Sequence, residues 1–104
     1  MSNAIQKLME PKSIAVIGAS TDPKKTAGRP IAYLQKHHFK GKIYPVNPRV
    51  EEIAGLKCYP DIDSLPETPD VAIIMVGTDK ALSAVKELSA RGTPAAIVLT
   101  SGFA

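Results

Sequence analysis

The residues best suited to bind an anion follow the first apolar segment of the chain. Ser13–Ile17 is a short apolar run, and Gly18–Ser20 follows it directly. Gly28 and Arg29 stand just before Pro30, which suits the first turn of a helix because that position needs no backbone N–H. Backbone N–H groups in such a loop, with the positive end of a helix dipole, form an anion site.

The same loop supplies further donors but departs from the dinucleotide fingerprint. Ser20 and Thr26 add hydroxyl groups, and Lys25 and its neighbour at position 24 add positive charge. A Gly-x-Gly-x-x-Gly motif counted from Gly18 would need glycines at positions 20 and 23, which hold serine and proline. The alternative is that Gly18 is only a turn residue at the end of a strand.

A second candidate group follows the apolar segment 42–46. NAD sites usually place a carboxylate there to accept both ribose hydroxyls. This chain has Asn47, Pro48 and Arg49 instead, with no acid before Glu51. Asparagine and arginine would attract a phosphate on the ribose, which favours CoA or NADP over NAD. The alternative is that the Asn-Pro pair forms a simple turn.

The sequence indicates no catalytic residue and no metal site. His37 and His38 fall near the end of a predicted helix, where a histidine usually complements the helix dipole. Cys58 is expected to be a small buried hydrophobe rather than a nucleophile. Ser20 and Ser101 have no identifiable base.

Apolar runs alternate with amphipathic segments, which predicts a parallel α/β sheet with right-handed crossovers. If the strands at 42–46 and 71–76 flank the strand at 13–17, a ligand crevice is expected outside the carboxyl ends of the first and third strands. Asp79 is expected to cap the second helix, which would bury Leu82, Val85 and Leu88. The predicted elements are strands at 13–17, 42–46, 71–76 and 95–99, helices ending at Gly41 and Gly92, an edge strand near 56–59 and a helical turn near 61–65.

Length and composition place further bounds. The 104 residues, 44% hydrophobic and 22% charged, fit one domain. The single cysteine excludes an intramolecular disulfide, and the longest apolar run, Val71–Val76, is too short to span a membrane. No leader opens the chain, so we expect a cytoplasmic protein.

Positive charge is concentrated in the first half of the chain. Residues 1–52 carry nine lysines and arginines against four acids, although the whole chain has a net charge of only +3. No aromatic residues are interleaved with these charges, which argues against nucleic acid. Two interpretations of the positive charge remain, a local anion site and an ordinary solvated basic face.

Several motifs together resemble one known family. The chain is similar to the CoA-binding domain of NDP-forming acyl-CoA synthetases, which include ADP-forming acetyl-CoA synthetase and the α subunit of succinyl-CoA ligase. The similarity covers essentially 11–104. The segments that carry it are Pro11–Ser20, Gly28–Pro30, Gly41–Arg49, Glu52–Pro60, Leu65–Pro66, Pro69–Ile74 and Ser101–Phe103.

The resemblance implies a Rossmann-like parallel sheet with helices on both faces, C-terminally truncated, that holds coenzyme A. Residues 1–10 would form a helical lead-in, part of which resembles a cloning remnant, and 11–104 the CoA-binding domain. The family's ligand contacts would fall on Gly18, Ala19, Ser20, Gly28 and Arg29 for the diphosphate, beside the positive charge of Lys25; on Asn47, Pro48 and Val76 for adenosine, beside Arg49; and on Ser101, Gly102 and Phe103 for pantetheine.

Two departures from the family matter. Many relatives carry proline where this chain has Gly77, and the family's phosphorylated histidine and nucleotide-grasp domain lie beyond this sequence. We therefore expect a CoA-binding domain of an acid–thiol ligase that acts with further domains or subunits and binds CoA or acyl-CoA. The alternatives are a stand-alone or regulatory CoA module, such as one beside a protein acetyltransferase domain, and an NADP-binding Rossmann fragment. An exposed strand edge would also permit a homodimer.

Overall fold

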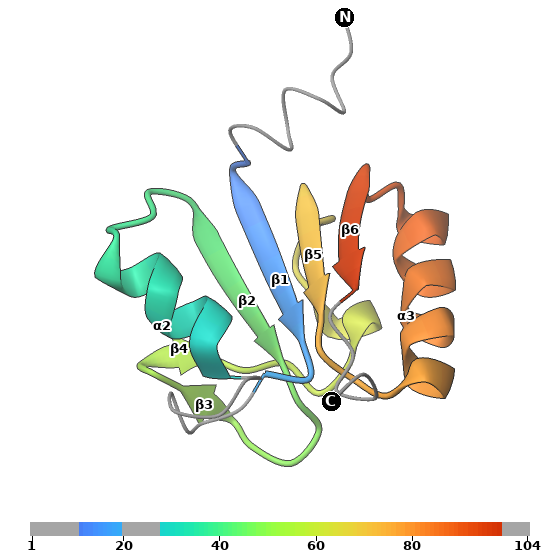
Figure 1. Ribbon diagram of the computed structural model, residues 1–104, viewed down its shortest axis with the longest axis horizontal. Helices are drawn as coiled ribbons and strands as arrows, with labels where there is room; N and C mark the ends of the chain where they lie inside the picture. The colour runs from blue at the N-terminus through green and yellow to red at the C-terminus, as the bar shows by residue number, and fades with distance from the viewer. Residues whose placement is uncertain (1–10, 20–27, 99–104) are drawn as a thin grey trace, which may run out of the picture.

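A parallel four-stranded sheet forms the centre of the protein (Figure 1). The computed structural model describes residues 11–19 and 28–98. The strand order β2-β1-β5-β6 puts β1 between β2 and β5, as the sequence predicted. The strands are β1 (Ser13–Ile17), β2 (Lys42–Val46), β5 (Val71–Ile74) and β6 (Ala95–Val98).

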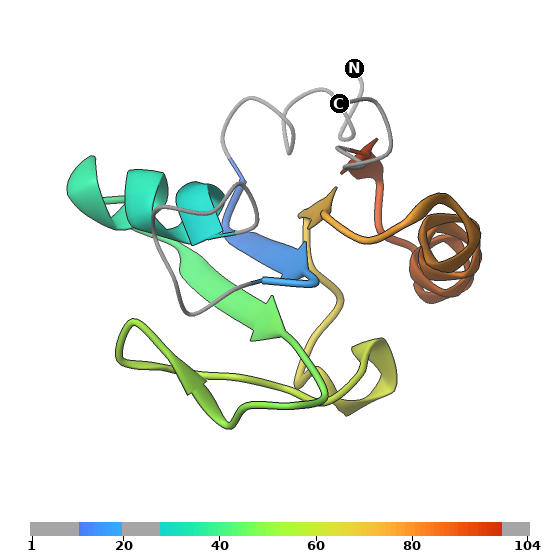
Figure 2. The same ribbon diagram turned by 60° about the horizontal axis from the view of Figure 1, so that its bottom comes forward.

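Two helices cover opposite faces of this sheet (Figure 2). Side chains alternate along a strand, so each face receives every second residue. On one face, Ile31 of α2 (Arg29–Lys36) packs with Ile14 and Val16. On the other face, α3 (Thr78–Arg91) packs with Ala15 and Ile17. The predicted Rossmann-like α/β architecture with helices on both faces is confirmed.

A small hairpin closes part of the outer edge of β2. It pairs β3 (Glu52–Ile53) with β4 (Leu56–Lys57) around Ala54 and Gly55, both of which have positive φ. The sequence predicted only the second of these strands. The following Tyr59 donates its N–H to the carbonyl of Pro45 at 2.9 Å. Pro45 stays within β2, opposite Val16, although a proline has no N–H to donate to a sheet.

The other element boundaries differ modestly from expectation. Strand β5 ends at Ile74 rather than at position 76. Helix α2 ends at Lys36, five residues before Gly41, because His38 turns into the left-handed region at φ 55°. The predicted helical turn is a short 3-10 helix, η2 (Ile62–Ser64), capped by Asp61. No helix in the described residues is long and apolar enough to cross a membrane.

The buried face of α3 is not the expected one. Ala81, Ala84 and Leu88 face the sheet, and all three are buried. Leu82 is 61% exposed and Val85 is 36% exposed, so two of the three predicted core residues lie at the surface. The helix begins at Thr78 with Gly77 as its N-cap, not at Asp79. Asp79 instead lies in the first turn, where its charge complements the helix dipole.

The assignment of the buried face of α3 can be tested by truncating two leucines of this helix to alanine. Leu88→Ala should lower the free energy of unfolding by about 2–5 kcal/mol, because the leucine side chain is only 1% exposed and its removal leaves a cavity against the sheet. Leu82→Ala, the matched control, should change it by no more than about 0.5 kcal/mol. Urea unfolding followed by circular dichroism measures both, and similar losses would contradict the assignment.

Candidate functional site

A crevice opens where the chain reverses the order of its strands. The connection after β1 leads to β2 on one side, whereas the connection after β5 leads to β6 on the other. A cavity of about 430 Å³ lies at their carboxyl ends, where such folds hold ligands. Its lining comes from the ends of three strands, from the segment around η2 and from α3: Ile17, Gly18, Val46, Pro48, Pro60, Asp61, Ile62, Val76, Asp79, Lys80, Ser83, Ala84 and Glu87.

Gly18 gives this crevice a wall of bare backbone. Its φ is +85°, and a Cβ built on it would lie 2.6 Å from Cγ1 of Val76 and 2.9 Å from the carbonyl oxygen of Met75. Only glycine fits both the conformation and the space. The N–H of Gly18 donates to the carbonyl of Val46 at 2.8 Å, which ties the turn after β1 to the end of β2.

Asn47 joins the two loops that border the crevice. Its Nδ2 donates to the carbonyl of Ala19 at 2.9 Å, and its Oδ1 accepts from the N–H of Arg49 at 2.8 Å. One amide hydrogen and one oxygen lone pair remain for a ligand. The side chain of Asn47 therefore mainly holds the two loops together. Pro48 and Arg49, which follow it, are exposed.

The amino ends of both helices lie at the edge of the sheet that carries the strand arrowheads (Figure 1). Gly28, which is buried, is the N-cap of α2 and supplies no side-chain cap; the first turn contains no acid. Within the first turn of α2, no carboxylate therefore offsets the partial positive charge at this helix end. Arg29, exposed at the start of α2, adds a full positive charge.

The structure brings together part of the predicted site. Gly18, Pro48 and Val76 line one crevice, and Asn47 links the loops around it. Four other predicted residues, Ala19, Gly28, Arg29 and Arg49, are not among those that line the cavity. The predicted Ser20, Lys25 and Ser101–Phe103 lie outside the described residues.

Sequence reasoning missed the contributions of η2 and α3 to the crevice. Asp79, Ser83 and Glu87 recur every four residues, which puts them on one stripe of α3, and all three line the cavity. This polar stripe was the only signal available. The lining includes three carboxylates, those of Asp61, Asp79 and Glu87, and one lysine, Lys80. Phosphate groups are therefore favoured on the side of Gly18 and the amino end of α2.

Together, the switch-point crevice and the bare glycine turn define a Rossmann-like nucleotide-binding domain. The family model described as "CoA binding domain" matches residues 12–104. The chain therefore belongs to the CoA-binding domain family. The predicted ligand of the domain, coenzyme A, is confirmed at the level of this family.

The curated relatives are much longer proteins than this chain. The chain is 41% identical over 103 residues to the ADP-forming acetate–CoA ligase II of Archaeoglobus fulgidus, covering 95% of this chain and 15% of that protein. It is 40% identical over 93 residues to the α subunit of the ADP-forming acetate–CoA ligase II of Pyrococcus furiosus, covering 89% of this chain and 20% of that subunit. The chain thus spans no more than a fifth of these two relatives.

Solved structures show the same relationship. A dinucleotide-forming acetyl-coenzyme A synthetase of Candidatus Korarchaeum cryptofilum superposes with a TM-score of 0.87 at 43% identity, over 95% of this chain and 22% of that one. A conserved hypothetical protein of Pyrococcus furiosus is much closer in size. It superposes with a TM-score of 0.69 at 36% identity, over 78% of this chain and 68% of that one.

Cys58 lies in the core behind the crevice loops. Its thiol is buried and donates to the carbonyl of Asn47 at 3.6 Å. Burial raises the pKa of the Cys58 thiol, an effect larger than the opposing hydrogen bonds to Asn47 and Tyr59. The folded protein therefore keeps this thiol protonated at neutral pH. Among the described residues, no three histidine, cysteine or carboxylate side chains come together to hold a metal ion.

The close approach at Gly18 predicts different costs at two glycines. Gly55→Ala should destabilise by about 1–2 kcal/mol, since the backbone is left-handed but nothing lies within 4 Å of the added Cβ. Gly18→Ala should cost about 1–3 kcal/mol more, because the methyl group also overlaps Val76 and Met75. Urea unfolding of both variants tests this, and equal losses would mean that the turn relaxes freely.

The raised pKa of Cys58 predicts a pH-dependent stability. The unfolded thiol loses its proton near pH 8.5. The folded thiol retains its proton to a higher pH, so the contribution to stability is complete below pH 8.5 and declines above it. Between pH 7 and pH 9.5 the wild type should therefore lose more stability than Cys58→Ala does, measured by urea unfolding. The same pH dependence in both proteins would contradict this assignment.

Proposed function

We propose that this chain is the CoA-binding part of an NDP-forming acyl-CoA synthetase. The observation that carries the proposal is the crevice at the β1–β5 switch point, with a bare glycine turn on one rim and Asn47–Arg49, rather than an acid, on the other. Family membership and the ADP-forming acetate–CoA ligases among the relatives support it.

The crevice fits part of the cofactor rather than all of it. A cavity of about 430 Å³ suits a nucleoside-sized group, with Pro48 and Val76 as apolar walls. The diphosphate would lie against the α2 end and the glycine turn, on the side away from the carboxylates of α3. The proposed contacts are Gly18, Ala19, Ser20, Lys25, Gly28 and Arg29 for the diphosphate, Asn47, Pro48 and Val76 for adenosine, Arg49 for the ribose phosphate, and Ser101, Gly102 and Phe103 for pantetheine.

The role of the chain would be to position the cofactor. Coenzyme A supplies the thiol that accepts an acyl group, and the proposal assigns no catalytic residue to this chain. Holding a nucleophile in a fixed orientation lowers the entropic part of the barrier. Further domains or subunits of the parent acid–thiol ligase would supply the activated acyl group.

A stand-alone CoA-binding module is the second candidate. The solved Pyrococcus furiosus protein of similar size favours it, since this chain covers 68% of that protein. Both candidates use the same crevice. We also propose a cytoplasmic location, consistent with a free, buried cysteine, and a homodimer through the β6 edge, where Ile97 and Val98 are exposed.

The ribose-phosphate assignment predicts a selective loss of affinity. Arg49→Glu should weaken CoA binding about tenfold or more, because a charge-assisted hydrogen bond is replaced by repulsion. Binding of dephospho-CoA, which lacks that phosphate, should change less than about twofold. Calorimetric titration of the wild type and the variant with both ligands measures this.

Lys86→Glu, on the exposed surface of α3, is the control with the same change in charge. Equal losses for CoA and dephospho-CoA would contradict the role of Arg49. A wild-type preference for NADP over CoA would favour the Rossmann-fragment alternative. Failure to bind any of the three ligands would contradict the proposed function of the chain.

A further inference from the structure

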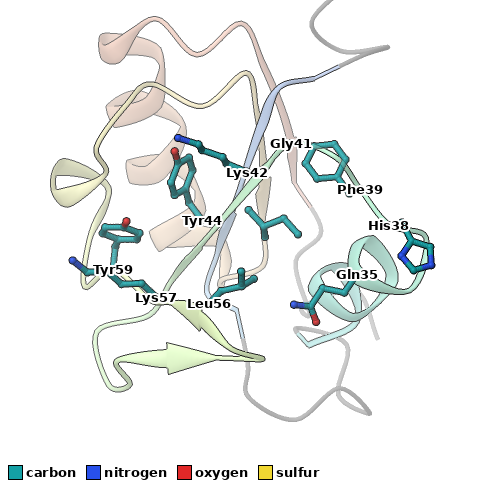
Figure 3. Close-up of a pocket in the computed structure, with 10 residues that line it drawn as sticks. Gln35, His38, Phe39, Gly41, Lys42, Tyr44, Leu56, Lys57 and Tyr59 are labelled. Atoms are coloured by element: carbon teal, nitrogen blue, oxygen red, sulfur yellow. The ribbon is translucent and has the colours of Figure 1, made fainter.

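A second cavity lies at the outer edge of β2, between the carboxyl end of α2 and the β3–β4 hairpin (Figure 3). Its volume is about 540 Å³, and it shares no lining residue with the crevice. Lys42, Ile43 and Tyr44 of β2 line it, together with residues of the two flanking elements. Nothing in the proposed binding of CoA uses this cavity.

The backbone of β2 presents one unpaired residue to this cavity. In a parallel strand, alternate residues direct both main-chain groups to the same neighbour. Lys42 donates to the carbonyl of Lys12 at 2.9 Å, and the carbonyl of Val46 accepts from the turn after β1, so residues 42, 44 and 46 face β1.

Ile43 and Pro45 therefore face the outer edge. The carbonyl of Pro45 is taken by Tyr59, whereas Ile43 has no strand partner on that side within residues 11–19 and 28–98. Its N–H and C=O are free to pair with an incoming extended chain.

Side chains of different chemistry lie on the two sides of β2 at this edge. Lys42 and Lys57 are both exposed, and the Nζ of Lys57 lies 5.2 Å from the ring centroid of Tyr59. Figure 3 shows these side chains and Tyr44 on one side of β2, and Phe39 near the end of α2 on the other. Ile43 points opposite to its neighbours in β2 because strand side chains alternate.

The first side carries two lysines, Lys42 and Lys57, with two carboxylates beside them. The adjacent carboxylates are Glu52, in register with Lys57 across the hairpin, and Glu67, which accepts the hydrogen bond from Tyr44. Lys12 and Lys40 lie with Lys42 around the neighbouring cavity at the start of β2. The basic excess of the first half of the sequence therefore gathers partly at this edge, away from the crevice.

We propose that the outer edge of β2 binds an extended segment of a partner polypeptide in which acidic and apolar residues alternate. The segment would pair with the free backbone groups of Ile43. Its acidic side chains would lie over Lys42 and Lys57, and its apolar side chains against Phe39 and Ile43. Period-two alternation follows from the geometry of a strand, so one pairing register satisfies both sides.

The test uses a fluorescein-labelled peptide of four Val-Glu repeats, with fluorescence anisotropy as the readout. The 104-residue chain should bind this peptide, and a Val-Lys repeat of equal length should bind at least tenfold more weakly. The same Val-Glu peptide with every backbone nitrogen methylated should also lose at least tenfold, because it has no N–H group to donate to the carbonyl of Ile43 in any register. Binding should weaken as salt is raised.

Lys57→Glu should lower affinity at least fivefold, whereas Lys86→Glu, an equal charge change on α3, should leave it unchanged. All titrations are repeated with saturating CoA. Undiminished binding of the methylated peptide, equal binding of the Val-Lys peptide, no binding of any peptide, or competition by CoA would each overturn the inference. The absence of peptide binding would leave the proposed function untouched, because the calorimetric titration decides separately whether CoA binds.

Discussion

The close contact between Gly18 and Val76 is the constraint on which the site depends. Without a side chain at position 18, the chain turns out of β1 directly against the segment that leaves β5, and backbone hydrogen bonds fix both neighbours. Gly18 donates to the carbonyl of Val46 at the end of β2, and Met75, which follows β5, donates to the carbonyl of Ile17, each at 2.8 Å. Three strands thus end at one turn, and the backbone of this turn lines the crevice.

Charge is divided between two separate surfaces of the sheet. Arg29 and Arg49 lie in the connections at the carboxyl ends of the strands, with the α2 amino end. Lys12, Lys40 and Lys42 lie at the amino ends of β1 and β2, where a different cavity opens. The sequence interpretation of a single local anion site combined these surfaces, although Lys12 precedes β1 and Lys42 begins β2, which puts both at the amino ends of their strands.

The four central strands could be predicted because parallel strands buried on both faces are continuous apolar runs. Their order, and hence the place of the crevice, was also predicted. The buried face of α3 could not be predicted, since Ala81 and Ala84 have the same helical spacing as Leu82 and Val85. Small side chains allow α3 to approach the sheet closely, which is a property of packing. The β3–β4 hairpin is too short for an alternating pattern, and the crevice residues of α3 are brought there only by tertiary structure.

The buried position of Cys58 has a consequence for covalent chemistry. Thioesters pass their acyl groups to thiolates, and CoA disulfides exchange with them, so a protein that concentrates such molecules exposes its own cysteines to modification. Here the single thiol of the chain is protonated, enclosed in the core and hydrogen bonded to the carbonyl of Asn47, directly behind a loop of the crevice. The burial of Cys58 therefore protects this thiol from acylation by a thioester and from exchange with a CoA disulfide.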